Sequence, residues 1–180
     1  MKRLKIEKLE VNNKEILEKC AELYCQIWKE PPWSEDFWTV KRVIKDIREE
    51  MERKNAVGFL ALYGDEVVGF IWGYEVSKED LRQISGVDAL DVLFKKRARV
   101  FYIDELGVAS LFRRRGIGEQ LSRTLITVVR NSCKIQCFTF RTDIKVPAVA
   151  RNLYIKLGFR DLSVRDAEHS QRTYWVLEIP

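Results

Sequence analysis

The sequence has few of the residues that build metal, disulfide or catalytic-triad sites: four cysteines and one histidine in 180 residues. Cys20, Cys25, Cys133 and Cys137 form no C-x-x-C pair, so we expect buried small hydrophobes rather than a zinc site or a disulfide framework. His169 stands alone and no G-x-S-x-G motif is present, which argues against a Ser-His-Asp hydrolase. The prediction is a chain without a metal.

Long apolar runs are also missing. No stretch approaches the ~18 residues of a membrane helix, so no membrane partner is expected. The basic start, residues 1–7, has no apolar stretch or cleavage site behind it, which predicts a cytoplasmic location. A hydrophobic content of 46% with 33% charged residues excludes a disordered chain. No repeat or linker marks a second unit, so a single domain over 1–180 is expected.

Hydrophobic periodicity predicts an alternation of helices and strands. Strands are expected over 3–11, 57–63, 67–76, 99–109, 135–142, 159–164 and 173–179. Helices are expected over 14–29, about 35–54 (with Ser34 as N-cap), 116–131 and 147–158. Residues 78–98 are expected to be irregular, with a short helix near 88–96. This order indicates an α/β (α+β mixed) fold with a central, mostly antiparallel sheet of about seven strands flanked by helices.

The stretch from Tyr102 to Gly118 carries the strongest chemical signal. A strand runs into a basic, glycine-containing turn that opens an amphipathic helix. The first N–H groups of a helix lack internal partners and face the positive end of its dipole, so they favour an anion such as phosphate. Neither a Walker loop nor a dinucleotide fingerprint fits, because Leu121 stands where the latter needs glycine.

This stretch resembles the GNAT superfamily of N-acetyltransferases. The family signature [Q/R]-x-x-G-x-[G/A] reads Arg113-Arg114-Arg115-Gly116-Ile117-Gly118 here. Residues 152–159 match the family's L-Y-x-x-x-G-F segment, and residues 67–70 match its V-V-G-F strand. The resemblance extends over most of the chain and implies a GNAT-like fold.

The resemblance implies binding of acetyl-CoA, or another acyl-CoA, and acyl transfer to an amine. The backbone amides of Arg113, Arg114, Arg115, Gly116, Ile117 and Gly118 would hold the pyrophosphate. The strand at Leu106, Gly107 and Val108 would pair with the pantetheine arm at a bulge, where it splays away from the strand 138–142. Gly107 suits such a bulge because glycine accepts an irregular backbone. Pro147 stands where many relatives have an asparagine, so contacts from that loop are not carried over.

Amide formation needs a neutral amine, whereas most amines are protonated at pH 7, so a general base is expected. We name Glu105 first. Asp104 should point to the opposite face, because side chains alternate along a strand. Tyr154 is the expected proton donor to the departing thiolate. Alternatively, the carboxylates merely pair with a basic residue and Tyr154 is a core tyrosine.

The acceptor side is expected at the aromatic, acidic junction 28–38. Trp33 could stack on a substrate, with Glu30, Glu35 or Asp36 attracting a cationic amine. A hydrophobic lid packed on the core is the alternative. A closed pocket would suit a small molecule, whereas an open groove would suit a protein amine, and the sequence does not decide between them. The sequence does not determine the oligomeric state either, although a homodimer is common in such families.

Two other functions remain open. A catalytically silent acyl-CoA-binding module would keep the same signature. The net charge of +5 and the basic runs 95–99 and 113–115 would suit a nucleic-acid-binding protein, but no such motif accompanies them, so no nucleic acid is expected. The run 95–99 could also face the phosphates of CoA, an acidic substrate or only water.

Overall fold

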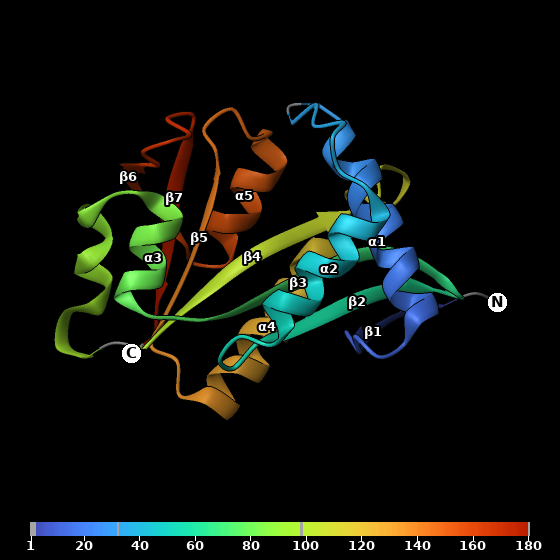
Figure 1. Cartoon of the computed structure of the whole chain (residues 1–180), viewed down its shortest axis with the longest axis horizontal. Helices are drawn as coiled ribbons and strands as arrows, with labels where there is room; N and C mark the ends of the chain where they lie inside the picture. The colour runs from blue at the N-terminus through green and yellow to red at the C-terminus, as the bar shows by residue number, and fades with distance from the viewer. Residues whose placement is uncertain (1–2, 32, 98, 180) are drawn as a thin grey trace.

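One seven-stranded sheet runs through the computed structural model, which describes residues 3–31, 33–97 and 99–179 (Figure 1). The strand order is β1-β2-β3-β4-β5-β7-β6. The strands are β1 (Leu4–Lys8), β2 (Val57–Tyr63), β3 (Glu66–Val76), β4 (Val100–Val108), β5 (Cys137–Asp143), β6 (Arg160–Arg165) and β7 (Arg172–Glu178). All neighbours are antiparallel except β4 and β5. The predicted fold class is therefore confirmed.

Helices cover both faces of the sheet. The α-helices are α1 (Lys14–Lys29), α2 (Val40–Met51), α3 (Lys78–Ser85), α4 (Ile117–Cys133) and α5 (Ala148–Lys156), with 3-10 turns at η1 (Asp88–Arg97) and η2 (Ser110–Phe112). The apolar faces of α1 and α2 pack on Leu60 and Phe70. The α4 helix packs on the other face, where Leu125 joins Ile71 and Phe101. A third cluster packs Leu81 of α3 and Leu90 of η1 against Tyr102 and Tyr174, so three cores stabilise the sheet.

The β4 and β5 strands begin together and then separate. They pair only from Val100 opposite Cys137 to Tyr102 opposite Thr139, and Figure 1 shows them diverging beyond that point. The edge of β4 that faces β5 therefore has no strand partner over its last six residues. The predicted splaying of this strand from 138–142 is confirmed, and it opens the sheet at the place where a ligand backbone could pair with β4.

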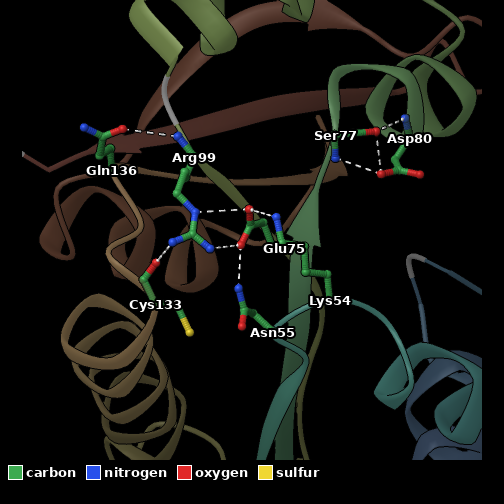
Figure 2. Close-up of polar contacts among 8 residues, drawn as sticks. All are labelled: Lys54, Asn55, Glu75, Ser77, Asp80, Arg99, Cys133 and Gln136. Carbon is green, nitrogen blue, oxygen red and sulfur yellow. Dashed lines mark hydrogen bonds and ion pairs between the residues drawn. The ribbon is translucent and has the colours of Figure 1, made fainter.

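A polar network fixes the base of this split (Figure 2). The guanidinium of Arg99, just before β4, donates from Nε to Glu75 Oε1 at 3.1 Å and also contacts the carbonyl oxygen of Cys133 at the end of α4. Lys54 and Asn55 donate to the same Glu75 carboxylate. Burial alone would raise the pKa of Glu75, but these hydrogen bonds lower it to about 2. The network joins β3, β4 and α4 below the split.

The irregularity of β4 lies at Asp104, not at Gly107. Trp72 pairs with Glu105 and Gly73 pairs with Ile103, so Asp104 is the extra residue of a β-bulge. Gly107 pairs in register with Phe70. The bulge interrupts the alternation of side chains, and Asp104 and Glu105 consequently line the same cavity. The prediction that they point to opposite faces is wrong for this reason.

The second helix begins later than its local signals suggest. Ser34 has a φ of +52° and is not an N-cap; the cap is Thr39, whose side chain accepts from the N–H of Arg42. Glu35 instead donates its N–H to the carbonyl of Trp28 at 2.7 Å, and its carboxylate accepts from Trp38 Nε1. These longer-range bonds hold residues 33–39 as a strap rather than a helix.

Residues 78–98 are more regular than predicted. The α3 helix starts with a capping box in which Ser77 and Asp80 bond each other's backbone N–H groups (Figure 2). The expected short helix near 88–96 is present as the 3-10 segment η1. Residue 98 and the side chains of Lys96 and Arg97, which belong to the basic run 95–99, lie outside the described part of the chain.

Candidate active site

Three adjoining cavities follow the split between β4 and β5. A groove of about 410 Å³ lies between the start of α4 and α5. A cavity of about 300 Å³ lies under α1 and α2. A junction of about 80 Å³ shares Leu106 and Tyr154 with the groove and Asp104 and Glu105 with the cavity. The cavities therefore form one path through the sheet.

The groove has the features of an anion-binding cradle. Its floor includes Leu106, Gly107 and Val108, and its end includes Arg113, Arg114, Gly116, Ile117 and Gly118. Arg115 instead stacks over the ring of Phe112, with its guanidinium carbon 5.3 Å from the ring centroid. Within the described residues, the backbone N–H groups of 114–119 have no acceptor. They gather at the positive end of α4, where they suit a phosphate.

Backbone conformation keeps this cradle open. Gly116 precedes α4 with a φ of +79°, in the left-handed region that favours glycine, and a Cβ atom there would meet nothing within 4 Å. Arg114 also has a positive φ, of 62°. Arg113 is held by its Nε, which donates to the carbonyl of Val108 at 3.0 Å. The residues present thus fit the pyrophosphate of acetyl-CoA.

The junction brings the expected proton donor beside the expected base. Tyr154 packs on Phe140, with ring centroids 4.5 Å apart, and lines both the groove and the junction. Burial raises the pKa of its hydroxyl, which keeps the group protonated at neutral pH. Glu105 and Asp104 line the same junction. A reacting group in the junction could therefore have Tyr154 as proton donor on one side and a carboxylate as base on the other.

The cavity beyond the junction is acidic. Its wall comes from α1, α2 and α3, from strands β3, β4, β5 and β7, and from the strap. Five carboxyl groups line it, against two guanidinium groups: Glu35, Asp46, Glu50, Asp104 and Glu105, with Arg141 and Arg172. Aromatic rings supply most of the remaining wall.

Each of the three innermost carboxyl groups accepts a hydrogen bond from an aromatic side chain. The Tyr24 hydroxyl donates to Glu105 at 3.0 Å and the Tyr74 hydroxyl donates to Asp104 at 2.8 Å. Trp72 Nε1 donates to Glu50 at 2.7 Å. These bonds fix the carboxyl groups in place.

Burial raises the pKa values of all three carboxyl groups, and repulsion adds to this for Glu105 and Glu50. Burial is the main cause for Glu105, and the charges of Asp104 and Glu50 add to it, so its pKa lies well above the usual range. Burial raises the pKa of Glu50, and the charge of Asp104 raises it further. Burial also raises the pKa of Asp104, although a hydrogen bond with Glu50 opposes this. A raised pKa makes the ionised carboxylate of Glu105 a stronger base, which fits the role expected from the sequence.

The two arginines of the cavity wall are already neutralised. Arg141 Nη1 donates to the buried Asp166 at 2.7 Å and to the carbonyl of Ile84 at 3.1 Å. Arg172 lies 3.5 Å from Glu35. Because both arginines are paired, the net charge of the cavity depends on the remaining carboxyl groups.

The acceptor residues expected from the sequence are separated by the structure. Trp33 lines all three cavities and packs edge-on against Trp28 at 4.9 Å. Glu30 lines the groove instead, where it pairs with Arg113 at 2.6 Å. Asp36 is exposed and lines none of the cavities, whereas Glu35 lines the acidic one.

Sequence reasoning missed the residues that complete the cavity: Tyr24, Asp46, Glu50, Trp72, Tyr74, Arg141 and Arg172. One signal was readable. Asp46 and Glu50 are four residues apart on α2, on the flank of the buried positions Val43 and Ile47. The run 95–99 contributes no described residue to the three cavities, and Arg99 is paired with Glu75.

Two negative findings complete the description. Within residues 3–31, 33–97 and 99–179, no helix is long and apolar enough to cross a membrane. In the same ranges, no group of three or more histidine, cysteine, aspartate and glutamate side chains is arranged to hold a metal ion.

A cradle that suits a phosphate-bearing donor, joined through a junction lined by two carboxyl groups and a tyrosine to a separate polar cavity, is the arrangement of a two-substrate group-transfer enzyme. The sequence matches the Acetyltransferase (GNAT) family over residues 17–159. The chain therefore belongs to that family and is an acetyl-CoA-dependent N-acetyltransferase. A search of curated proteins finds no match.

Solved structures of similar fold include the NatC complex bound to Gag peptide and CoA, at 15% identity and a TM-score of 0.71, covering 99% of both chains. The ribosomal-protein-S18-alanine N-acetyltransferase from Escherichia coli has 16% identity and a TM-score of 0.67, covering 98% of this chain and 94% of that one. Aminoglycoside 6'-acetyltransferase type Ii has 19% identity and a TM-score of 0.69, covering 98% of both. At these identities the likeness shows the fold.

Proposed function

We propose that the chain transfers an acetyl group from acetyl-CoA to a primary amine of a small cationic molecule. The observation that carries this is the acidic cavity, which meets the cofactor groove at a junction lined by Glu105 and Tyr154. Negative cavity walls attract and orient a cation, and aromatic faces add to that attraction. At about 300 Å³, the cavity also has the size of a small-molecule site.

In this proposal Glu105 is the general base. The amine enters as an ammonium ion and must lose a proton before it can attack the thioester. A carboxylate with a raised pKa takes that proton more readily than an ordinary one. The bond from Tyr24 fixes the carboxylate during the transfer. Asp104, which lines the junction beside Glu105, holds the ammonium group by its charge.

Tyr154 is the proton donor in the same proposal. Acetyl-CoA supplies the activated thioester when it is bound. Tyr154 lines both the groove and the junction, where its hydroxyl can protonate the leaving sulfur. Arg113 and the backbone amides from 114 to 118 hold the pyrophosphate, and the free edge of β4 at 106–108 orients the pantetheine arm. Bringing amine and thioester together supplies much of the rate.

The neighbouring structures include enzymes named for a protein alanine and for an aminoglycoside. The acidic cavity favours the second kind of acceptor, a small molecule with cationic amines, over a protein terminus. A silent acyl-CoA-binding module would need neither a base with a raised pKa nor an acid beside it.

The first experiment is a calorimetric titration of acetyl-CoA into the wild type and into Gly116→Glu, Gly118→Glu. Micromolar binding that the variant loses supports the cradle. Release of free CoA with small primary amines then tests turnover. Binding without release in a broad amine screen would overturn the enzyme proposal in favour of a silent module.

A further inference from the structure

The acidic cavity contains more carboxyl groups than one amine needs. Asp104 and Glu105 line both the cavity and the junction, so they can serve the nitrogen that reacts. Glu50 lines the cavity alone, on the side formed by α2. Because Glu50 also hydrogen-bonds with Asp104, it extends the carboxyl cluster from the junction into the cavity.

The inner carboxyl groups lack a counter-ion. Arg141 is paired with Asp166, Arg172 with Glu35, and Asp46 lies 3.8 Å from Arg42. In the part of the chain that the structure describes, no lysine or arginine lies within 4.0 Å of Glu50, Asp104 or Glu105. The charges of Arg53, Arg141 and Arg172 act on them from further away. Each of these groups accepts an aromatic hydrogen bond but has no cationic partner. Burial raises their pKa values, and a cation from outside would allow them to ionise.

A second group in the wall is also without a partner. Tyr102 is 1% exposed and lines the cavity, yet among the described residues its hydroxyl makes no hydrogen bond. A hydroxyl oxygen accepts hydrogen bonds from an ammonium group, and buried hydroxyls are usually satisfied. Tyr102 stands on β4, two residues before Asp104, and is not needed for the acetyl-transfer chemistry.

We infer that the acceptor carries two ammonium groups, one at the junction and one bound in the cavity by Glu50, with Asp104 between them. This inference rests on the proposed function and names its substrate class, a linear aliphatic diamine or polyamine. Hydrogen bonds from Tyr74 and Trp72 hold the carboxyl groups of Asp104 and Glu50 in place to bind the second ammonium group. The cavity, at about 300 Å³, is at the small end of small-molecule sites and fits a slender chain.

The test compares linear diamines, from diaminopropane to diaminooctane, each beside the monoalkylamine with the same number of heavy atoms. We expect the best diamine to exceed its monoamine in kcat/KM by at least about tenfold, because a buried charge pair contributes that much or more. A ratio near one at every length would overturn the inference.

Glu50→Gln should reduce the diamine-to-monoamine ratio by about tenfold. Glu49→Gln is the matched control: Glu49 is exposed on the same helix and pairs with Lys45 at 3.4 Å, so the ratio should not change. An unchanged ratio in Glu50→Gln would contradict the role of Glu50. The wild-type comparison decides the substrate class even if that variant does not fold.

Calorimetry separates this inference from the proposed function. Diamine is titrated into the protein in two buffers of different ionisation enthalpy, without acetyl-CoA. Release of protons upon binding, reduced in Glu50→Gln, supports the second cation site because the carboxyl groups must ionise to hold it. Such binding without CoA release from any amine would overturn only the proposed function. Equal turnover of diamines and monoamines would overturn only the inference.

Discussion

Asp104 and Glu105 are adjacent in β4, and both carboxyl groups face one cavity because Asp104 is the extra residue of a β-bulge opposite Trp72 and Gly73. The bulge depends on the absence of a side chain at 73. A Cβ atom there would lie 2.2 Å from the carbonyl oxygen of Tyr102. One glycine on a neighbouring strand therefore supports the position of two carboxyl groups.

Gly73→Ala should lower both stability and activity. The added methyl group must push β4 away at the bulge, at a cost of about 1–3 kcal/mol in the free energy of unfolding. We expect kcat/KM to fall at least about tenfold in the fraction that stays folded. Urea unfolding and a CoA-release assay measure the two effects. Gly69→Ala on the same strand, whose closest contact would be 3.1 Å, should be milder; equal effects would count against the bulge.

Asp104→Asn should shift the acid limb of the pH–rate profile to lower pH. Burial is the main cause of the raised pKa of Glu105, and the charge of Asp104 is the next. Removing that charge lowers the pKa of Glu105, so the base ionises at lower pH. The profile of kcat/KM against pH measures the shift, with Glu49→Gln as the control. A limb that stays in place or moves upward would exclude Glu105 as the titrating base.

Tyr154→Phe should lower kcat by about 100-fold, because the departing thiolate loses its proton donor. The ring still packs on Phe140 and Trp175, so the free energy of unfolding should change little. Steady-state kinetics and thermal unfolding measure these quantities. Tyr63→Phe removes a hydroxyl from a ring that packs on Phe112, away from the junction, and should leave kcat unchanged. Equal kcat values in the two variants would contradict the role of Tyr154 as proton donor and would indicate that it is only a core residue.

Glu75→Gln should destabilise the protein at neutral pH but not in strong acid. The folded pKa of Glu75 is about 2, below its ordinary value of 4.5, so its carboxylate stabilises the fold above pH 4.5 and loses that effect as the pH falls toward 2. We expect a loss of about 2 kcal/mol at pH 7, less than the full shift because Arg99 and Lys54 are partly exposed.

Urea unfolding at several pH values measures this difference, with the exposed Glu66→Gln as a control. The wild type and Glu75→Gln should converge as the pH approaches 2. A constant difference across that range would show that the Glu75 network (Figure 2) contributes through packing and not through its charge.

The sequence predicted the elements whose patterns are local. The apolar periodicity of α1 and α4 and the glycine that ends α5 were sufficient to locate those helices. The start of α2 was misplaced because Ser34 and Glu35 look like a helix start, whereas Glu35 is engaged by Trp28, Trp38 and Arg172. The α3 helix was missed although its capping box, Ser77 with Asp80, is readable.

The site was only partly predictable for a different reason. The cradle at 113–118 is one continuous segment, so its spacing is visible in the sequence. The acidic cavity combines single residues from α1, α2, β3, β4, β5 and β7, which only the folded sheet brings together. The bulge at Asp104 likewise depends on Gly73, more than thirty residues earlier in the sequence.

The role of Glu105 as the base is tested by the rate of CoA release by Glu105→Gln, measured at saturating acetyl-CoA with the best small amine. We expect kcat to fall at least about 100-fold, because the amine loses its base. Acetyl-CoA binding, measured by calorimetry, should be unchanged, since Glu105 does not line the groove. A variant that binds acetyl-CoA and releases CoA at the wild-type rate would contradict the account.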